Sequence, residues 1–298
     1  LYLSQEYTRR GMFSTAIEET FRAIQLSPNY LPAHIQLAEI LGRQGRNETA
    51  AKKFKVIADT FIVRGDTNGA IIAYERVLDV MPLNVSTRLR LIDLLKSRGQ
   101  IDRSLEHYKT IGESYYQLAQ VPKSRETYKK ALKLVPRATD ETTWKIRFLQ
   151  AIADIDMEQF DWKRALVGYK ELRALDSDDE WIAITLVSLY YRTGQKVNAV
   201  RELDIYMKQL VRAGRSNKVM GILEDMIHRQ PADANLVERL YKLYLQQDRK
   251  ADALKALDAL GEAQLEEGDA DGARRTIQKI LSLDPPNSES YQKLLASI

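Results

Sequence analysis

The sequence predicts an all-α fold built from stacked copies of one helical unit. The chain has 298 residues, 44% of them hydrophobic and 29% charged, but only 14 Gly and 8 Pro to form turns. This composition favours helices over many short strands. Aligning the prolines reveals an internal repeat of 54 residues without a gap. Within it, apolar residues recur at three- and four-residue steps, as in Ile71-Tyr74-Val77-Leu78, which is the spacing of an amphipathic helix.

The copies divide the chain into one predicted solenoid over residues 1–298. We expect a partial copy at 1–28, full copies at 29–82, 83–136, 178–231 and 232–285, a short copy at 137–177 and a final helix at 286–298. The chain begins without methionine and in the middle of a predicted helix, so we expect it to be part of a longer protein.

Certain residue types recur at the same position in several copies, and each of these alignment columns has a physical reason. Gly65 tolerates the left-handed backbone that ends one helix before the next begins. Asp66 is suited to cap the following helix. Ala70 lets two helices approach closely, and Tyr74 fills the space four positions further on. Pro82 lacks an amide hydrogen and therefore stops the third helix of the copy.

The set Gly65, Ala70, Tyr74, Leu78 and Pro82, preceded by Ile57-Ala58 and Phe61, resembles the tetratricopeptide repeat. The resemblance implies a right-handed α-solenoid of helix-turn-helix repeats with a groove for peptides or partner proteins. The copies differ from the family in length, because its repeat has about 34 residues and two helices. A 54-residue copy has room for three helices, and residues 48–64 would serve two neighbouring repeats.

Some members of the family hold a peptide carboxylate with Lys and Asn on successive first helices. This sequence has Ile35 with Glu39, Leu89 with Asp93, and Ile184 with Ser188 at the corresponding positions. The clamp is absent, so we do not expect a chaperone tail as the ligand.

Residues that could carry catalysis or bind a metal are sparse. There is no cysteine, and the three histidines, His34, His107 and His228, are far apart in the sequence. We find no phosphate-binding glycine loop and no nucleophile elbow. A segment that begins at Glu267 opens like a calcium loop but has Arg274 and Gln278 where an apolar residue and a glutamate are needed. We therefore expect no enzyme, no metal and no cofactor.

The tripeptide Arg64-Gly65-Asp66 matches a cell-adhesion signal. Its glycine and aspartate recur as Gly268 and Asp269 in another copy, while the arginine position holds glutamate there. The repeat therefore accounts for the tripeptide as a turn between helices, and adhesion is the less favoured interpretation.

Function is expected on the surface of the first helix of each copy. At several positions of this helix the charged and polar residues differ from copy to copy, while the glycine, alanine and leucine positions are kept. Such variation is typical of a groove adapted to a particular ligand, and equally of a face that only contacts solvent. The candidate groove residues are Gln36, Glu39, Arg43, Arg90, Asp93, Lys96, Trp181, Thr185, Ser188, Arg192, Arg239 and Lys242. A group of aromatic residues in the later copies suggests either interface anchors or core packing: Trp181, Tyr190, Tyr191, Tyr241 and Tyr244.

Charge suggests the kind of partner. Residues 83–136 carry 11 Lys and Arg against 5 Asp and Glu, whereas residues 232–298 carry 9 against 12. We expect a protein or peptide partner of acidic character docking toward residues 83–136. Nucleic acid and membrane insertion are not expected, a cytoplasmic location is, and self-association through the end repeats is a further expectation. The main prediction is a protein-interaction scaffold or adaptor. The alternative is a regulatory or assembly segment of a larger multidomain enzyme or transcription regulator.

Overall fold

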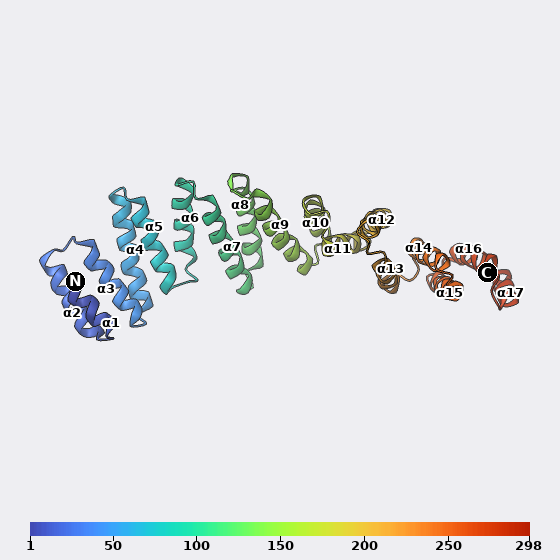
Figure 1. The fold of residues 1–298 in the computed structure, drawn as a ribbon, viewed down its shortest axis with the longest axis horizontal. Helices are drawn as coiled ribbons and strands as arrows, with labels where there is room; N and C mark the ends of the chain where they lie inside the picture. Colours follow the sequence, from blue (N-terminus) through green and yellow to red (C-terminus); the bar gives the residue numbers. More distant parts are fainter. The chain divides into compact units, whose positions relative to one another are not determined.

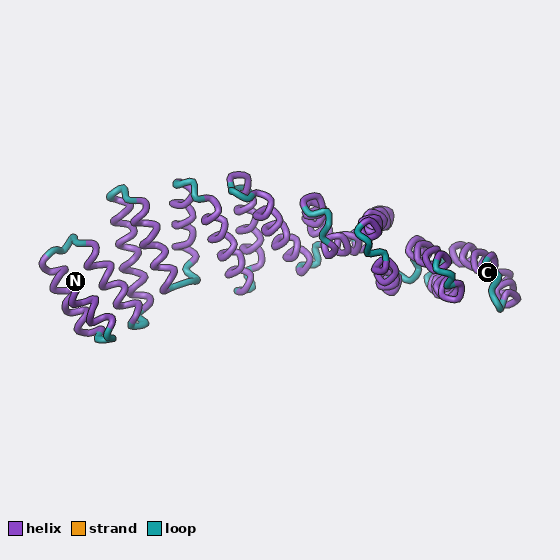
Figure 2. Tube along the Cα trace, viewed as in Figure 1, coloured by secondary structure: helices purple, strands orange, loops and turns teal.

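The computed structural model describes all residues from 1 to 298 and contains helices and loops only (Figure 2). The predicted all-α class and helical-repeat arrangement are therefore confirmed. The helices are α1 (Tyr2–Arg9), α2 (Phe13–Leu26), α3 (Leu31–Arg43), α4 (Asn47–Val63), α5 (Thr67–Val80), α6 (Val85–Ser97), α7 (Ile101–Gln117), α8 (Val121–Leu132), the 3₁₀ turn η1 (Val135–Arg137), α9 (Glu141–Glu158), α10 (Trp162–Leu175), α11 (Glu180–Arg192), α12 (Lys196–Arg212), α13 (Asn217–Arg229), α14 (Ala234–Gln246), α15 (Lys250–Glu266), α16 (Ala270–Ser282) and α17 (Ser288–Ser297).

The chain forms two compact units, Leu1–Leu175 and Asp176–Ile298. In the first unit, helices that follow one another in sequence lie side by side (Figure 1). Each of the four predicted 54-residue copies contains three helices, and the short copy contains α9 and α10. The division into copies and the single solenoid remain predictions.

Ten turns between consecutive helices share one backbone geometry. In each, one residue has a positive φ, and seven of these ten residues are glycine because a side chain is strained in this conformation. At Gly65, where φ is 77°, the amide of Gly65 donates to Ile62 O at 3.0 Å and that of Asp66 to Phe61 O at 2.9 Å. These two bonds satisfy the carbonyls at the end of α4. The ten residues are Gly11, Gly45, Gly65, Gly99, Ala119, Phe160, Gly194, Gly214, Asp248 and Gly268.

A small residue follows nine of these ten turns at a distance of five positions. All nine are alanine or serine and are 0% exposed: Ala16, Ala50, Ala70, Ser104, Ser124, Ala165, Ala199, Ala253 and Ala273. The tenth position holds Val219, which is 6% exposed. Asp284 also has a positive φ, but the helix after it, α17, buries no residue. At nine of the ten turns, a small buried side chain therefore permits the two helices to approach closely.

Side-chain caps begin several of the helices, as the sequence predicts for Asp66. Its Oδ1 accepts a hydrogen bond of 2.9 Å from the amide of Gly69 at the start of α5. Asp269 caps α16 in the same way through Gly272. In the acidic run before Trp181, Asp179 accepts from the amide of Ile182 at 2.8 Å, so this run begins α11.

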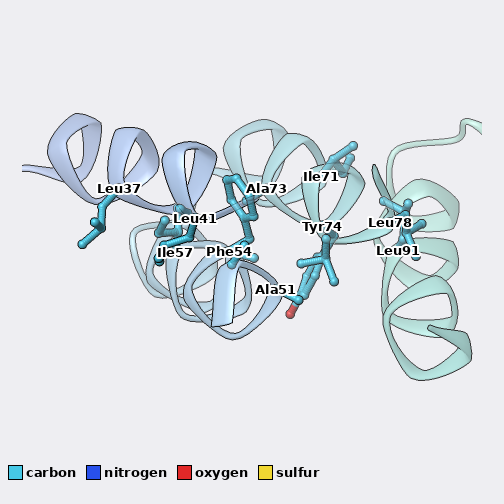
Figure 3. Close-up of a cluster of buried hydrophobic side chains, with 14 of the residues drawn as sticks. Leu37, Leu41, Ala51, Phe54, Ile57, Ile71, Ala73, Tyr74, Leu78 and Leu91 are labelled. Atoms are coloured by element: carbon cyan, nitrogen blue, oxygen red, sulfur yellow. The ribbon is translucent and has the colours of Figure 1, made fainter. Parts of the chain in front are cut away.

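The core of the first unit passes from α3 to α6 as one cluster of buried side chains. Phe54 of α4 and Tyr74 of α5 are 2% and 3% exposed and fill the space beside the small residues, as the repeated columns predict (Figure 3). A second cluster lies over α7, α8 and α9, and a third over α11 to α15 in the second unit.

Candidate functional site

The predicted groove residues differ widely in exposure. Arg43, Arg90, Asp93, Trp181, Arg192 and Lys242 are exposed, whereas Glu39, Lys96, Ser188 and Arg239 are half-buried. Gln36 and Thr185 are only 7% and 9% exposed, so the expectation of a surface position is wrong for these two. Gln36 Nε2 instead donates to Thr8 Oγ1 at 3.4 Å, across the packing between helices.

The basic side chains of α6 do not act together as one patch. Arg88 turns back onto the chain, where it donates to Pro82 O at 2.8 and 3.2 Å and to Nδ1 of His107 at 3.1 Å. Lys96 lies 3.4 Å from Asp93 and is partly neutralised by it. Arg90 is exposed and has no carboxylate within ion-pair distance. Arg90 therefore presents the unpaired charge on this helix.

His107 is held in its neutral form. Burial, together with the charges of Arg88 and Arg103, lowers the pKa of His107 to about 4. The neutral ring can accept the hydrogen bond from Arg88 at Nδ1. In this form the ring of His107 in α7 holds the Arg88 side chain of α6.

A pocket of about 360 Å³ opens between α6, α7 and α8, inside the most basic predicted copy. Its apolar lining includes Leu89, which is 45% exposed, and the rings of Tyr108 and Tyr115. Lys123 and Lys130 also line it, and the Lys123 ammonium lies 5.6 Å from the centre of the Tyr115 ring. Glu126 is the acidic residue of the lining, so the pocket combines an apolar surface with a net positive charge.

In the second unit, two predicted residues come together in one pocket. Arg239 and Lys242 of α14 line a cavity of about 440 Å³ with side chains of α12 and α13. Arg239 forms two hydrogen bonds with Asp204, at 2.6 and 2.7 Å, and Lys242 lies 2.9 Å from Glu238. Lys208 also lines the pocket.

Neither a metal site nor a membrane span is found. No group of three or more His, Asp or Glu side chains is arranged to hold a metal ion. None of the helices combines the length and the apolar character that crossing a bilayer requires.

One family model matches the chain, at its C-terminal helices. Residues 255–287, which include most of α15 and all of α16, match the family model described as tetratricopeptide repeat. This segment is similar to a tetratricopeptide repeat. The resemblance seen in the sequence is thereby confirmed, while the 54-residue length of the copies stays a prediction. The expectation that the chain has no enzymatic activity agrees with this match, because stacked repeats of this kind form extended binding surfaces.

Several solved structures are also similar to the chain, at low identity. A tetratricopeptide repeat protein from Parabacteroides merdae is 16% identical, with a TM-score of 0.33, over 83% of this chain and 97% of that one. The yeast Sti1 TPR2AB domain in complex with pHSP90 is 15% identical, with a TM-score of 0.32, over 74% and 92%. A Rap protein complexed with competence and sporulation factor is 12% identical, with a TM-score of 0.37, over 99% and 74%. No curated protein matches the sequence.

The later aromatic residues mostly belong to the packing of the helices in the second unit. Tyr244 is buried, and Tyr190, Tyr191 and Tyr241 pack against the same apolar cluster. Trp181 is 53% exposed. Core packing therefore explains four of the five residues.

Sequence reasoning missed the pocket residues that lie outside the first helices. Tyr108, Tyr115 and Lys123 belong to α7 and α8, and Lys208 and Arg212 belong to α12. One signal for the second group was present in the sequence, because Val219 stands in a column that otherwise holds alanine or serine.

Proposed function

We propose that the chain is a protein-interaction scaffold that docks an acidic peptide or partner segment against residues 83–136. The pocket between α6, α7 and α8 is the observation that carries this proposal. Leu89, Tyr108 and Tyr115 offer apolar surface to an anchoring side chain, while Lys123 and Lys130 offer charge to a carboxylate beside it.

Net charge supports the same location. The copy has an excess of six positive side chains, from 11 Lys and Arg and 5 Asp and Glu, and Arg90 adds an unpaired charge on α6. Charges of this kind act mainly on the association rate and on partner choice. Because they are exposed, their effect is screened beyond about 8 Å at physiological salt.

The test begins with capture of partners on the full chain and continues with measured association rates. Two charge reversals are compared, Arg90→Glu with Lys96→Glu, and Lys123→Glu with Lys130→Glu. We expect both double variants to fold, since all four side chains lie outside the buried core. We expect the second to weaken binding and both to slow association, less so as salt rises.

If the basic surface of residues 83–136 only keeps the protein soluble, the charge reversals should leave binding and association unchanged. Association rates that respond neither to the reversals nor to salt would exclude docking at residues 83–136. Arg201→Glu with Arg229→Glu serves as the control, because these exposed arginines lie in the second unit and line neither pocket.

A further inference from the structure

The α12–α13 pair differs from the other nine helix pairs at the position five residues after the positive-φ residue of its turn. Val219 follows Gly214 by five positions, where the others have a fully buried alanine or serine. A second large residue, Tyr206, belongs to the same buried cluster as Val219. Tyr206 precedes Gly214 by eight positions, where the corresponding residues of three other pairs are Ile57, Ile111 and Leu260.

Both side chains are buried between the helices, at 6% exposure for Val219 and 2% for Tyr206. Interiors are close-packed, so larger side chains at such positions increase the separation of the backbones. The backbones of α12 and α13 accordingly have little close contact, whereas α4 and α5, and likewise α15 and α16, pack closely. Val219 and Tyr206 therefore hold α12 away from α13.

The separation leaves the 440 Å³ cavity beside Val219, lined by α12, α13 and α14. Its surface is mainly apolar and includes Met207, Val211 and Leu243. Val211 is 56% exposed, so its apolar side chain is open to a ligand. This cleft is named the α12–α14 cleft below.

Positive charge borders the α12–α14 cleft on two sides. Lys208 and Arg212 are four residues apart on α12, flank Val211, and have no carboxylate within ion-pair distance. Lys242 stands on α14. Asp204 is the acidic side chain of the lining, and Arg239 neutralises it through two hydrogen bonds. The net charge of the lining is therefore positive.

We propose that the α12–α14 cleft is a second docking site, which takes a large apolar side chain of an acidic partner segment. The apolar side chain covers Met207, Val211 and Leu243, and carboxylates beside it pair with Lys208 and Arg212. The volume of the cleft fits one or two large side chains rather than a whole helix. The proposal shares with the proposed function the idea of a scaffold for acidic segments, but it uses different residues in the other unit.

The experiment uses a display library of random peptides selected on the full chain. Selected peptides are sorted by their binding to Lys208→Glu with Arg212→Glu, and separately to Val211→Ser. All three positions are exposed, so the variants should keep their helicity. We expect one class of peptides rich in Asp and Glu with a single large apolar residue. Its affinity should fall about tenfold or more for the double reversal and less for Val211→Ser, with a steep salt dependence.

Controls separate this site from the pocket at residues 83–136. The α12–α14 class should bind Lys123→Glu with Lys130→Glu, and Arg201→Glu with Arg229→Glu, as well as it binds the unaltered chain. Peptides that bind all variants equally would overturn the α12–α14 site and leave the other pocket untouched. Sedimentation of the unaltered chain is also measured. A self-association abolished by Lys208→Glu with Arg212→Glu would instead assign the cleft to a second copy and overturn the partner segment.

Discussion

The hydroxyl of Tyr74 donates a 2.8 Å hydrogen bond to Asp59, fifteen residues earlier in the chain. The same pairing at the same separation joins Tyr169 to Asp154 at 2.7 Å. In both cases the ring lies in the core between two helices while its hydroxyl reaches a carboxylate nearer the surface. Burial and the Asp59 carboxylate raise the pKa of Tyr74 to about 12. Each aromatic residue thus fixes the second helix of a pair against the first.

The two parts of the Tyr74 side chain should contribute separately to stability. Tyr74→Phe removes only the hydrogen bond and should lower the free energy of unfolding by about 1 kcal/mol. Tyr74→Ala also removes the ring from the core and should cost roughly 3 to 5 kcal/mol. Urea unfolding followed by circular dichroism measures both. Hydrogen exchange should show lost protection in α4 to α6 with α9 and α10 unaffected, and an even loss from end to end would contradict repeat packing.

Gly112 in α7 should resist replacement by alanine. Alanine normally stabilises a helix interior by about 1 kcal/mol relative to glycine. A Cβ on Gly112, however, would lie within 2.5 Å of Cζ in the buried ring of Tyr128. We expect Gly112→Ala to destabilise the chain by about 1 to 3 kcal/mol. Thermal unfolding should show the opposite sign for Gly221→Ala in α13, where no atom lies within 4 Å of the added Cβ. A stabilising Gly112→Ala would disprove the close contact.

Arg125 of α8 and Asp156 of α9 form a pair that should be strongly coupled. Arg125 Nε and Nη2 donate to the carboxylate at 2.6 and 2.8 Å, and Asp156 is 3% exposed. Arg125→Met leaves a buried carboxylate unpaired and should cost about 3 to 5 kcal/mol. Asp156→Leu in the same chain should recover much of this loss. A double-mutant cycle by urea unfolding measures the coupling, and additive losses would show that the pair is unimportant.

The tripeptide Arg64-Gly65-Asp66 should have no adhesive function. Asp66→Asn destroys the signal but keeps an oxygen that can accept from the Gly69 amide, so stability and partner binding should be unchanged. Asp66→Ala should lose about 0.5 to 2 kcal/mol, because the cap of α5 is removed. Cell-attachment assays on the asparagine variant decide the point. If cells attach specifically to the unaltered chain but not to Asp66→Asn, and the variant keeps its helicity, the adhesion hypothesis would be supported.

Acid should weaken the fold partly through His107. Its folded-state pKa of about 4 lies below the ordinary value of 6.5. The unfolded chain therefore binds more protons between these values, and the stabilising effect of the neutral ring is lost as pH falls from 6.5 to 4. The ring is partly exposed, so we expect a loss on the order of 1 kcal/mol. Urea unfolding across this range should show a weaker pH dependence for His107→Gln, and an unchanged slope would exclude the histidine.

The sequence predicts the local packing of a helix pair well, because the residues that determine this packing are close together in the chain. Gly65, Asp66 and Ala70 lie within six residues and set the turn, the cap and the helix spacing by themselves. Exposure within a repeated column could not be predicted in this way. Gln36 and Arg90 share one column, yet the first is buried against Thr8 and the second is exposed.

The pockets could not be predicted for the same reason. Each needs side chains from three helices, and its opening depends on how far the helices stand apart. In the sequence, only Val219 in place of alanine indicated such a separation. Its meaning depends on the burial of the nine equivalent positions, which the structure shows to be complete.

The rule of one small residue behind each turn has a consequence for how such chains diversify. Alanine and valine codons differ only in their second base. A point mutation at one of these alanine positions can therefore introduce the valine found in α13, with no insertion and no new loop. Neighbouring pairs keep their own alanine or serine and their own spacing. A new cleft can therefore arise in one helix pair at a time, while the other pairs of the protein keep their packing.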